Sequence, residues 1–148
     1  MIWVTASRPG LDALASAWLI RRRLDGEARF VFVPAEHVGQ VARVTGGYAF
    51  DVPGGDYTHR VRPGDRDACT FEVLLAQHGL HADPALSRLA EAVSRGDAGE
   101  EAGDDELAVL LAGFVRRSCE AEADDHALLA QAMPLLDTLT RQLAGVAT

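Results

Sequence analysis

The sequence contains no lysine, and all 14 of its basic residues are arginine. Without a lysine amine the chain cannot form a Schiff base with a substrate or use lysine as a general base. It also has no run of about 18 apolar residues. This excludes a membrane-spanning helix and predicts a soluble protein with no membrane partner.

An excess of positive charge is missing as well. The formal net charge is -8 at pH 7, and the sequence pI is about 5.0. Neutralising nucleic-acid phosphates requires a basic surface. The charge balance therefore excludes nucleic acid as a general partner of this domain.

Cysteine is scarce, with only Cys69 and Cys119 in the chain. The opening residues, MIWVTASRP, lack the pattern of a secretory signal, so we expect a cytoplasmic protein. A reducing cytosol disfavours a structural disulfide, and each cysteine is expected to be a free thiol. Neither CxxC nor HExxH occurs, which excludes the common zinc patterns.

Short apolar and β-branched runs favour strands over residues 2–5, 29–33 and 48–52. Helical spacing of apolar residues predicts helices over 11–23 and 35–45, from about 70, over 84–96, from about 105 and from 124. These elements predict one domain over residues 1–148. The expected fold class is α/β or α+β, with a small, mainly N-terminal sheet and a helical second half.

Residues 49–75 concentrate ionisable and ligating side chains around a turn rich in proline and glycine. Charges of this kind are costly to bury unless they are paired or bound to a metal. The segment is therefore either a solvated surface loop or a site. The side chains concerned are Asp51, Asp56, His59, Asp65, Asp67, Cys69 and Glu72.

Within this segment, Cys69 and Glu72 share one face at a predicted helix start. A helix N-terminus lowers the pKa of a thiol and makes it reactive, whereas a small buried thiol is inert. The sequence is compatible with both a reactive and an inert Cys69 thiol. Cys69 and Asp12 are the candidate catalytic residues.

A second candidate site lies where the first strand meets the first helix. Free backbone N–H groups at a helix start suit an anion, and Arg8 adds a charged donor there. Arg21 and Arg22, in the last turn of the same helix, are able to bind an oxyanion or a carboxylate. The alternative is that Asp12 and these arginines only complement the helix dipole.

His126 follows two aspartates at the start of the last helix. It is either a surface histidine or a metal ligand brought beside His59 by the fold. Two imidazoles with a carboxylate from Glu72 or Asp97 suit Fe(II), Mn(II) or Zn(II). Asp51 would then orient a ligating histidine.

Four segments in this order, WVTASRPGLDALASAWLIRRRLDGEARFVFVP, AFDVPGGDYTH, CTFEVLL and ADDHALL, resemble the C-terminal domain of the chromate-resistance protein ChrB. The resemblance covers nearly the whole chain and implies a role in chromate resistance. Three departures stand out, because it leads us to expect lysine at Gly10, Cys-Pro at Ser16-Ala17 and aspartate at Glu72. These departures indicate a divergent member of the family.

The resemblance and the residues together predict a small metal-dependent protein or enzyme that acts on or senses an anionic small molecule. Its divalent metal would be held by His59, His126 and a carboxylate. One alternative is a metal-free module that binds an oxyanion such as chromate through Arg8, Arg21 and a helix N-terminus. Another is a biosynthetic enzyme of specialised metabolism on the same scaffold. Enzymatic activity and assembly into a homo-oligomer stay open.

Overall fold

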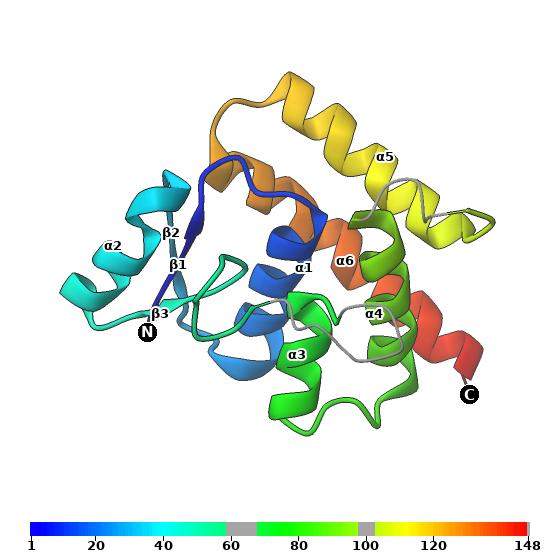
Figure 1. Ribbon diagram of the computed structural model, residues 1–148. Helices are drawn as coiled ribbons and strands as arrows, with labels where there is room; N and C mark the ends of the chain where they lie inside the picture. Colours follow the sequence, from blue (N-terminus) through cyan, green and yellow to red (C-terminus); the bar gives the residue numbers. More distant parts are fainter. Residues whose placement is uncertain (59–67, 98–102, 148) are drawn as a thin grey trace.

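The protein folds as a small parallel sheet with helices on both of its faces, and the computed structural model describes residues 1–58, 68–97 and 103–147 (Figure 1). The strands are β1 (Ile2–Ala6), β2 (Arg29–Val33) and β3 (Tyr48–Ala49). The helices are α1 (Leu11–Leu19), α2 (Val38–Thr45), α3 (Thr70–Gln77), α4 (Pro84–Asp97), α5 (Glu106–Ala121) and α6 (Asp125–Ala147). A π-helical segment, Ile20–Leu24, extends α1, and a 3-10 turn, Ala35–His37, precedes α2. The expected α/β class is confirmed.

The sheet has the strand order β2-β1-β3, and both pairings are parallel. The chain leaves β1, crosses through α1 to β2 on one side, and then crosses through α2 to β3 on the other side. Figure 1 shows α2 on one side of the sheet and the remaining helices on the opposite side. The two connections thus run in opposite directions along the sheet, and the switch point lies between the neighbouring strands β1 and β3.

Side chains of β1 alternate between two apolar clusters, as the pleat of a strand requires. Val4 packs with residues of α2 and β3 in the smaller cluster. Trp3 faces the other way, into the main core with Phe30, Phe50 and the helices. The central strand β1 is thus buried on both faces, which is usual for parallel strands.

The third strand is shorter than the sequence indicated. Regular pairing with β1 covers only Tyr48 and Ala49, and Phe50 adds a single bridge to Tyr57. Asp51 then adopts a left-handed backbone with φ 56°. An extended strand cannot continue through such a residue, so the prediction of a strand to residue 52 was wrong at its C-terminal end.

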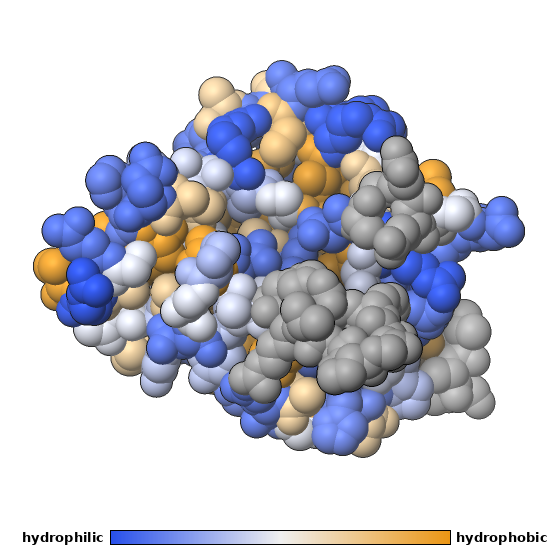
Figure 2. All heavy atoms as spheres, in the orientation of Figure 1, coloured by the Kyte–Doolittle hydropathy of each residue, from blue (hydrophilic) through white to orange (hydrophobic). Residues whose placement is uncertain are grey.

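No helix in the described part of the chain is long and apolar enough to cross a membrane. Figure 2 shows polar side chains over most of the visible face, with apolar side chains exposed at the outer end of α2. Val44, near the end of α2, is 81% exposed.

The connection from α2 to β3 passes close to β1 at Gly47. A Cβ atom at this position would lie 2.4 Å from the Ile2 carbonyl oxygen, which belongs to the backbone and cannot rotate away. We expect Gly47→Ala to lower the free energy of unfolding by about 1–3 kcal/mol, the usual cost of overpacking. Urea denaturation followed by circular dichroism measures this change.

Gly39→Ala is the matched control for this substitution. Gly39 lies in the exposed part of α2, and nothing lies within 4 Å of its added Cβ. Alanine has the higher helix propensity, so this variant should gain up to about 1 kcal/mol. An equal response of the two variants would show that the contact with Ile2 does not constrain the fold.

Candidate functional site

The candidate site lies at the C-terminal ends of β1 and β3, where the strand order reverses. In open parallel sheets, ligands bind at this switch point. The Phe50 N–H donates to the Val4 carbonyl at 3.0 Å, so Asp51 emerges next to the end of β1. Arg8 and Asp51, which follow the two strands, both have φ 56°. Left-handed residues other than glycine concentrate at functional sites, so their presence favours a functional role for this edge of the sheet.

Asp12 joins the first turn of α1 to the start of α3. It is 2% exposed, and its carboxylate accepts hydrogen bonds from the Thr70 N–H at 2.8 Å and the Phe71 N–H at 3.0 Å. These N–H groups belong to the first turn of α3, where no carbonyl of the helix can accept from them. The positive end of the α3 dipole also stabilises the Asp12 charge. Asp12 is therefore a buried anion held by another helix.

Asp51 meets Asp12 in a carboxyl pair. The Thr70 hydroxyl donates to Asp51 Oδ1 at 2.7 Å, and the two carboxyl groups share a hydrogen bond. Burial, and then the charge of Asp12, raise the pKa of Asp51 to about 8. The raised pKa favours the protonated form of Asp51 at neutral pH, with its proton in the hydrogen bond to Asp12.

Asp97, at the end of α4, completes what we call the carboxyl cluster of Asp12, Asp51 and Asp97. Its Oδ1 accepts the backbone N–H of Asp12 at 3.2 Å. The charge of Asp97 also contributes to the raised pKa of Asp51. Three carboxyl groups that are far apart in the sequence thus influence one another around the starts of α1 and α3.

Cys69 precedes α3 as its N-terminal cap. Its backbone N–H donates to Glu72 Oε1 at 3.4 Å, so Glu72 closes a capping box at the start of the helix. The thiol is buried, and burial followed by the charge of Asp12 raises its pKa. This is the opposite of the lowered pKa that a reactive thiol requires, so Cys69 has the environment of an inert buried thiol.

The predicted metal ligands are not gathered in the described part of the chain. His59 lies outside the described residues. His126 is exposed, and its ring packs edge-on against Phe32 with ring centroids 5.0 Å apart. Within residues 1–58, 68–97 and 103–147, no three His, Cys, Asp or Glu side chains are grouped so that they could hold a metal ion.

The three arginines proposed as anion ligands all have protein partners. The Arg8 guanidinium donates to the carbonyls of Cys119, Glu122 and Ala123, and thereby braces the turn from α5 to α6. Arg21 donates to the Ala28 carbonyl and lies over the Phe30 ring. Arg22 pairs with Asp137 through two hydrogen bonds. An anion would have to compete with these contacts.

Two polar residues of the site were not predicted from the sequence. Thr70 donates both its N–H and its hydroxyl to the carboxyl pair, and Ser16 Oγ is 3.4 Å from Asp12 Oδ1. Ser16 lies four residues after Asp12, the spacing at which helical side chains meet. That spacing was the available signal for Ser16, whereas Thr70 gave none beyond its place at a helix start.

Comparison with known proteins agrees with the resemblance noted in the sequence. Residues 3–143 match the family described as ChrB, C-terminal domain. Protein ChrB of Cupriavidus metallidurans is 38% identical over 142 residues, which cover 93% of this chain and 39% of that protein. The chain thus spans about two fifths of the length of this curated relative. No solved structure matches the chain.

Proposed function

The chain belongs to the ChrB C-terminal domain family, and on this premise we propose that it binds a small oxyanion in chromate resistance, with Asp51 as the proton-carrying group of its site. The observation that carries the proposal is the position of Asp51 at the switch point of the sheet, beside Asp12 and Thr70, where burial and the charge of Asp12 raise its pKa to about 8. A neutral carboxyl adds no charge repulsion to a bound anion, whereas a carboxylate repels it. Binding is therefore coupled to the protonation of Asp51.

The charge of the carboxyl cluster gives this proposal a definite pH dependence. Below a pH of about 8, Asp51 is neutral and the cluster carries one negative charge fewer than it does above that pH. Ionisation of Asp51 adds a charge that repels the oxyanion. Oxyanion binding should therefore weaken as the pH rises through the pKa of Asp51.

The test is calorimetric titration with chromate and with sulfate at pH values one unit below and one unit above about 8. The wild-type protein should bind chromate at least several-fold more tightly at the lower pH. Asp51→Asn keeps a neutral donor at both pH values, so its affinity should not change between them. Asp104→Asn, a substitution at an exposed residue outside the cluster, should behave like the wild type.

Two results would count against the proposal. One is the absence of oxyanion binding at either pH, and the other is an affinity whose pH dependence survives in Asp51→Asn. Sulfate distinguishes recognition of chromate from general attraction of dianions, because a purely electrostatic site would bind both anions alike.

A metal-dependent form of this function stays a second hypothesis, although no three His, Cys, Asp or Glu side chains of the described residues are grouped so that they could hold a metal ion. The assignment of His59 and His126 as ligands of Fe, Mn or Zn stays a prediction. Repeating the titrations with added Mn(II) or Zn(II) tests it, because a metal-dependent site would bind the oxyanion more tightly when the metal is present.

A further inference from the structure

The outer edge of β2 is an unpaired strand edge that is closed at both ends. The N–H of Arg29 and the carbonyl of Val33 are bonded to the β1 side, so residues 29, 31 and 33 direct their backbone groups toward β1. Phe30 and Phe32 therefore direct theirs outward, because these directions alternate along a strand. In the described part of the chain, these four outward groups have no hydrogen-bond partner.

Neighbouring residues limit the open edge to these two phenylalanines. The outward carbonyl of Ala28 accepts from Arg21 at 3.0 Å. Beyond the strand, Pro34 has no N–H, and its carbonyl accepts from the His37 N–H at 2.8 Å. The edge thus offers one N–H and one carbonyl at Phe30, the same pair at Phe32, and Val31 at its midpoint.

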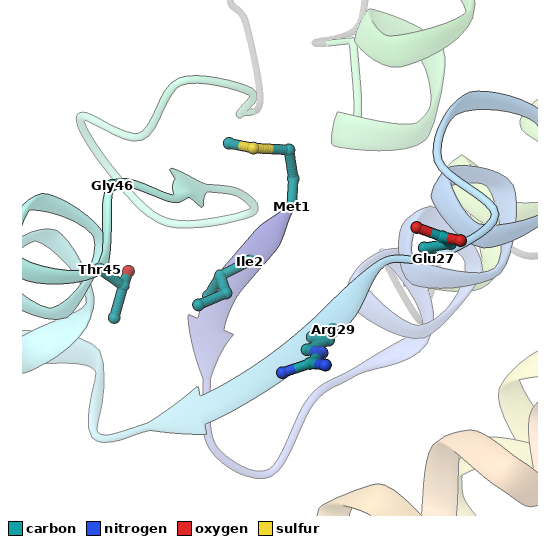
Figure 3. A pocket seen from close by; sticks show the side chains of 6 residues that line it. All are labelled: Met1, Ile2, Glu27, Arg29, Thr45 and Gly46. Carbon is teal, nitrogen blue, oxygen red and sulfur yellow. The ribbon is translucent and has the colours of Figure 1, made fainter.

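The face of β2 on the α2 side is apolar and only partly covered. Ile2, Val31 and Val33 are partly buried at the margin of the smaller cluster, because α2 lies over β1 and β3. A hollow of about 680 Å³ adjoins Ile2 and the start of β2. Figure 3 shows its lining, with Ile2 and Arg29 on the strands and Thr45 and Gly46 at the end of α2. A strand edge that is hydrophobic, unpaired and free of charge from Phe30 to Val33 is a template for pairing with another strand.

We infer that the domain forms a homodimer through antiparallel pairing of β2 with β2 of a second copy. A two-fold axis perpendicular to the sheet at Val31 places Phe30 opposite the partner's Phe32 and the reverse. All four outward groups on each edge then find partners, in four hydrogen bonds. The result is a continuous six-stranded sheet, and the closed groups at Ala28 and Pro34 lie opposite one another, where no further bond is required.

Charge favours this arrangement over a parallel one. Antiparallel pairing sets the two Arg29 side chains at opposite ends of the strand pair, whereas parallel pairing in register would place these like charges side by side. The edge is also self-complementary about its midpoint, the property that an isologous two-fold contact requires. Both features fit a second copy of this chain, whose β2 presents the same backbone groups at the same spacing.

In this dimer each residue of β2 has a defined partner across the two-fold axis. Val31 would lie opposite itself in a non-hydrogen-bonded pair, where Cα atoms are about 4.5 Å apart. That separation falls within the disulfide range of about 4.4–6.8 Å. Val33 would lie opposite Arg29, so its two copies would be separated by four residues along the strands, about 13 Å.

Sedimentation velocity and cysteine crosslinking test the inference. The wild-type protein should sediment as a dimer at micromolar concentration. In a Cys119→Ser background, which removes the partly exposed thiol, Val31→Cys should form a disulfide-linked dimer on oxidation. Val33→Cys, on the same strand and the same face, should stay monomeric on a non-reducing gel.

A variant without any disulfide provides an independent measurement. Val31→Lys brings two ammonium groups together at the axis and should shift the sedimenting species to the monomer, while its circular dichroism spectrum stays that of the wild type. A wild-type protein that is monomeric throughout the micromolar range would overturn the inference. Equal crosslinking of Val31→Cys and Val33→Cys, or a monomer that instead captures extended peptides, would overturn it too.

Discussion

Asp12→Ala is expected to lower the free energy of unfolding by about 3–5 kcal/mol, because it leaves the N–H groups of Thr70 and Phe71 buried without an acceptor. Each buried donor that loses its partner costs about 1–3 kcal/mol. Thr70 is 0% exposed, as is Phe71, so water cannot replace the carboxylate without opening the core. Urea denaturation near neutral pH, followed by circular dichroism, measures the loss.

Asp83→Ala is the matched control for this prediction. Asp83 also accepts from two N–H groups at a helix start, those of Ala85 at 3.0 Å and Leu86 at 3.3 Å. It lies next to α4 in the sequence and is 36% exposed, so water can satisfy the freed donors. We expect a loss of about 1 kcal/mol, the usual value for a helix cap. Equal losses in the two variants would mean that Asp12 is only a cap.

Asp12→Asn separates the charge of Asp12 from its shape. The amide oxygen still accepts one α3 N–H, but the negative charge that contributes to the raised pKa of Asp51 is removed. The carboxyl pKa of Asp51, followed by NMR titration, should therefore fall in this variant. An unchanged pKa would indicate that burial alone keeps Asp51 protonated.

The helices and strands of this fold could be predicted from the sequence because short local patterns determine them. The alternation of β1 and the helical spacing of α1 concern neighbouring residues, and both elements were predicted within a few positions. The end of β3 was not predictable in this way. It depends on the left-handed backbone of Asp51. The Asp51 N–H donates to the Tyr57 carbonyl, and its carboxyl accepts from the Thr70 hydroxyl.

The site was predictable in composition but not in arrangement. The crowding of ionisable residues drew attention to Asp51, Cys69 and Glu72, and the structure places these near Asp12 and Asp97 around the start of α3. The bonds that join them span 58 residues from Asp12 to Thr70 and 85 from Asp12 to Asp97, and no local pattern encodes such distances.

The partners of the arginines could not be predicted from the sequence either. A sequence shows that Arg8 is charged, but its guanidinium donates to backbone carbonyls at the end of α5 and pairs with Asp125. A carbonyl has no signature in the sequence. Gly10, where the resemblance leads us to expect lysine, lies next to the carboxyl cluster. A Cβ there would lie 3.4 Å from Asp97 Oδ1, so the expected lysine would begin its side chain beside the carboxyl cluster. Its absence removes a neighbouring cation.

Asp51→Asn is expected to flatten the pH dependence of stability between about pH 4 and pH 8. In the unfolded chain Asp51 releases its proton near its ordinary pKa of 3.8, whereas the folded protein keeps it to about 8. Over this range the native state binds more protons than the unfolded state, so stability falls as the pH rises. One such group contributes at most about 1.4 kcal/mol per pH unit. Above a pH of about 8 the contribution levels off, because both states have lost the proton.

Asparagine is the appropriate replacement because it keeps both contacts of the protonated acid. Its amide donates toward Asp12, and its oxygen accepts from the Thr70 hydroxyl, but it has no proton to lose. The variant should therefore gain on the wild type as the pH rises, and the gain should be largest near pH 8. Urea denaturation at one-unit pH intervals measures the difference between the two proteins at each pH.

Asp137→Asn shows what an ordinary surface carboxylate contributes in the same experiment. The Arg22 guanidinium lowers the pKa of Asp137, so the stability linked to its ionisation is present above its ordinary pKa and is lost only as the pH falls below it. The difference between Asp137→Asn and the wild type should thus be constant from about pH 5 to pH 8. If the curve of Asp51→Asn runs equally parallel to that of the wild type, Asp51 is ionised in the folded protein. The proton-coupled binding proposed for this site would then lose its basis.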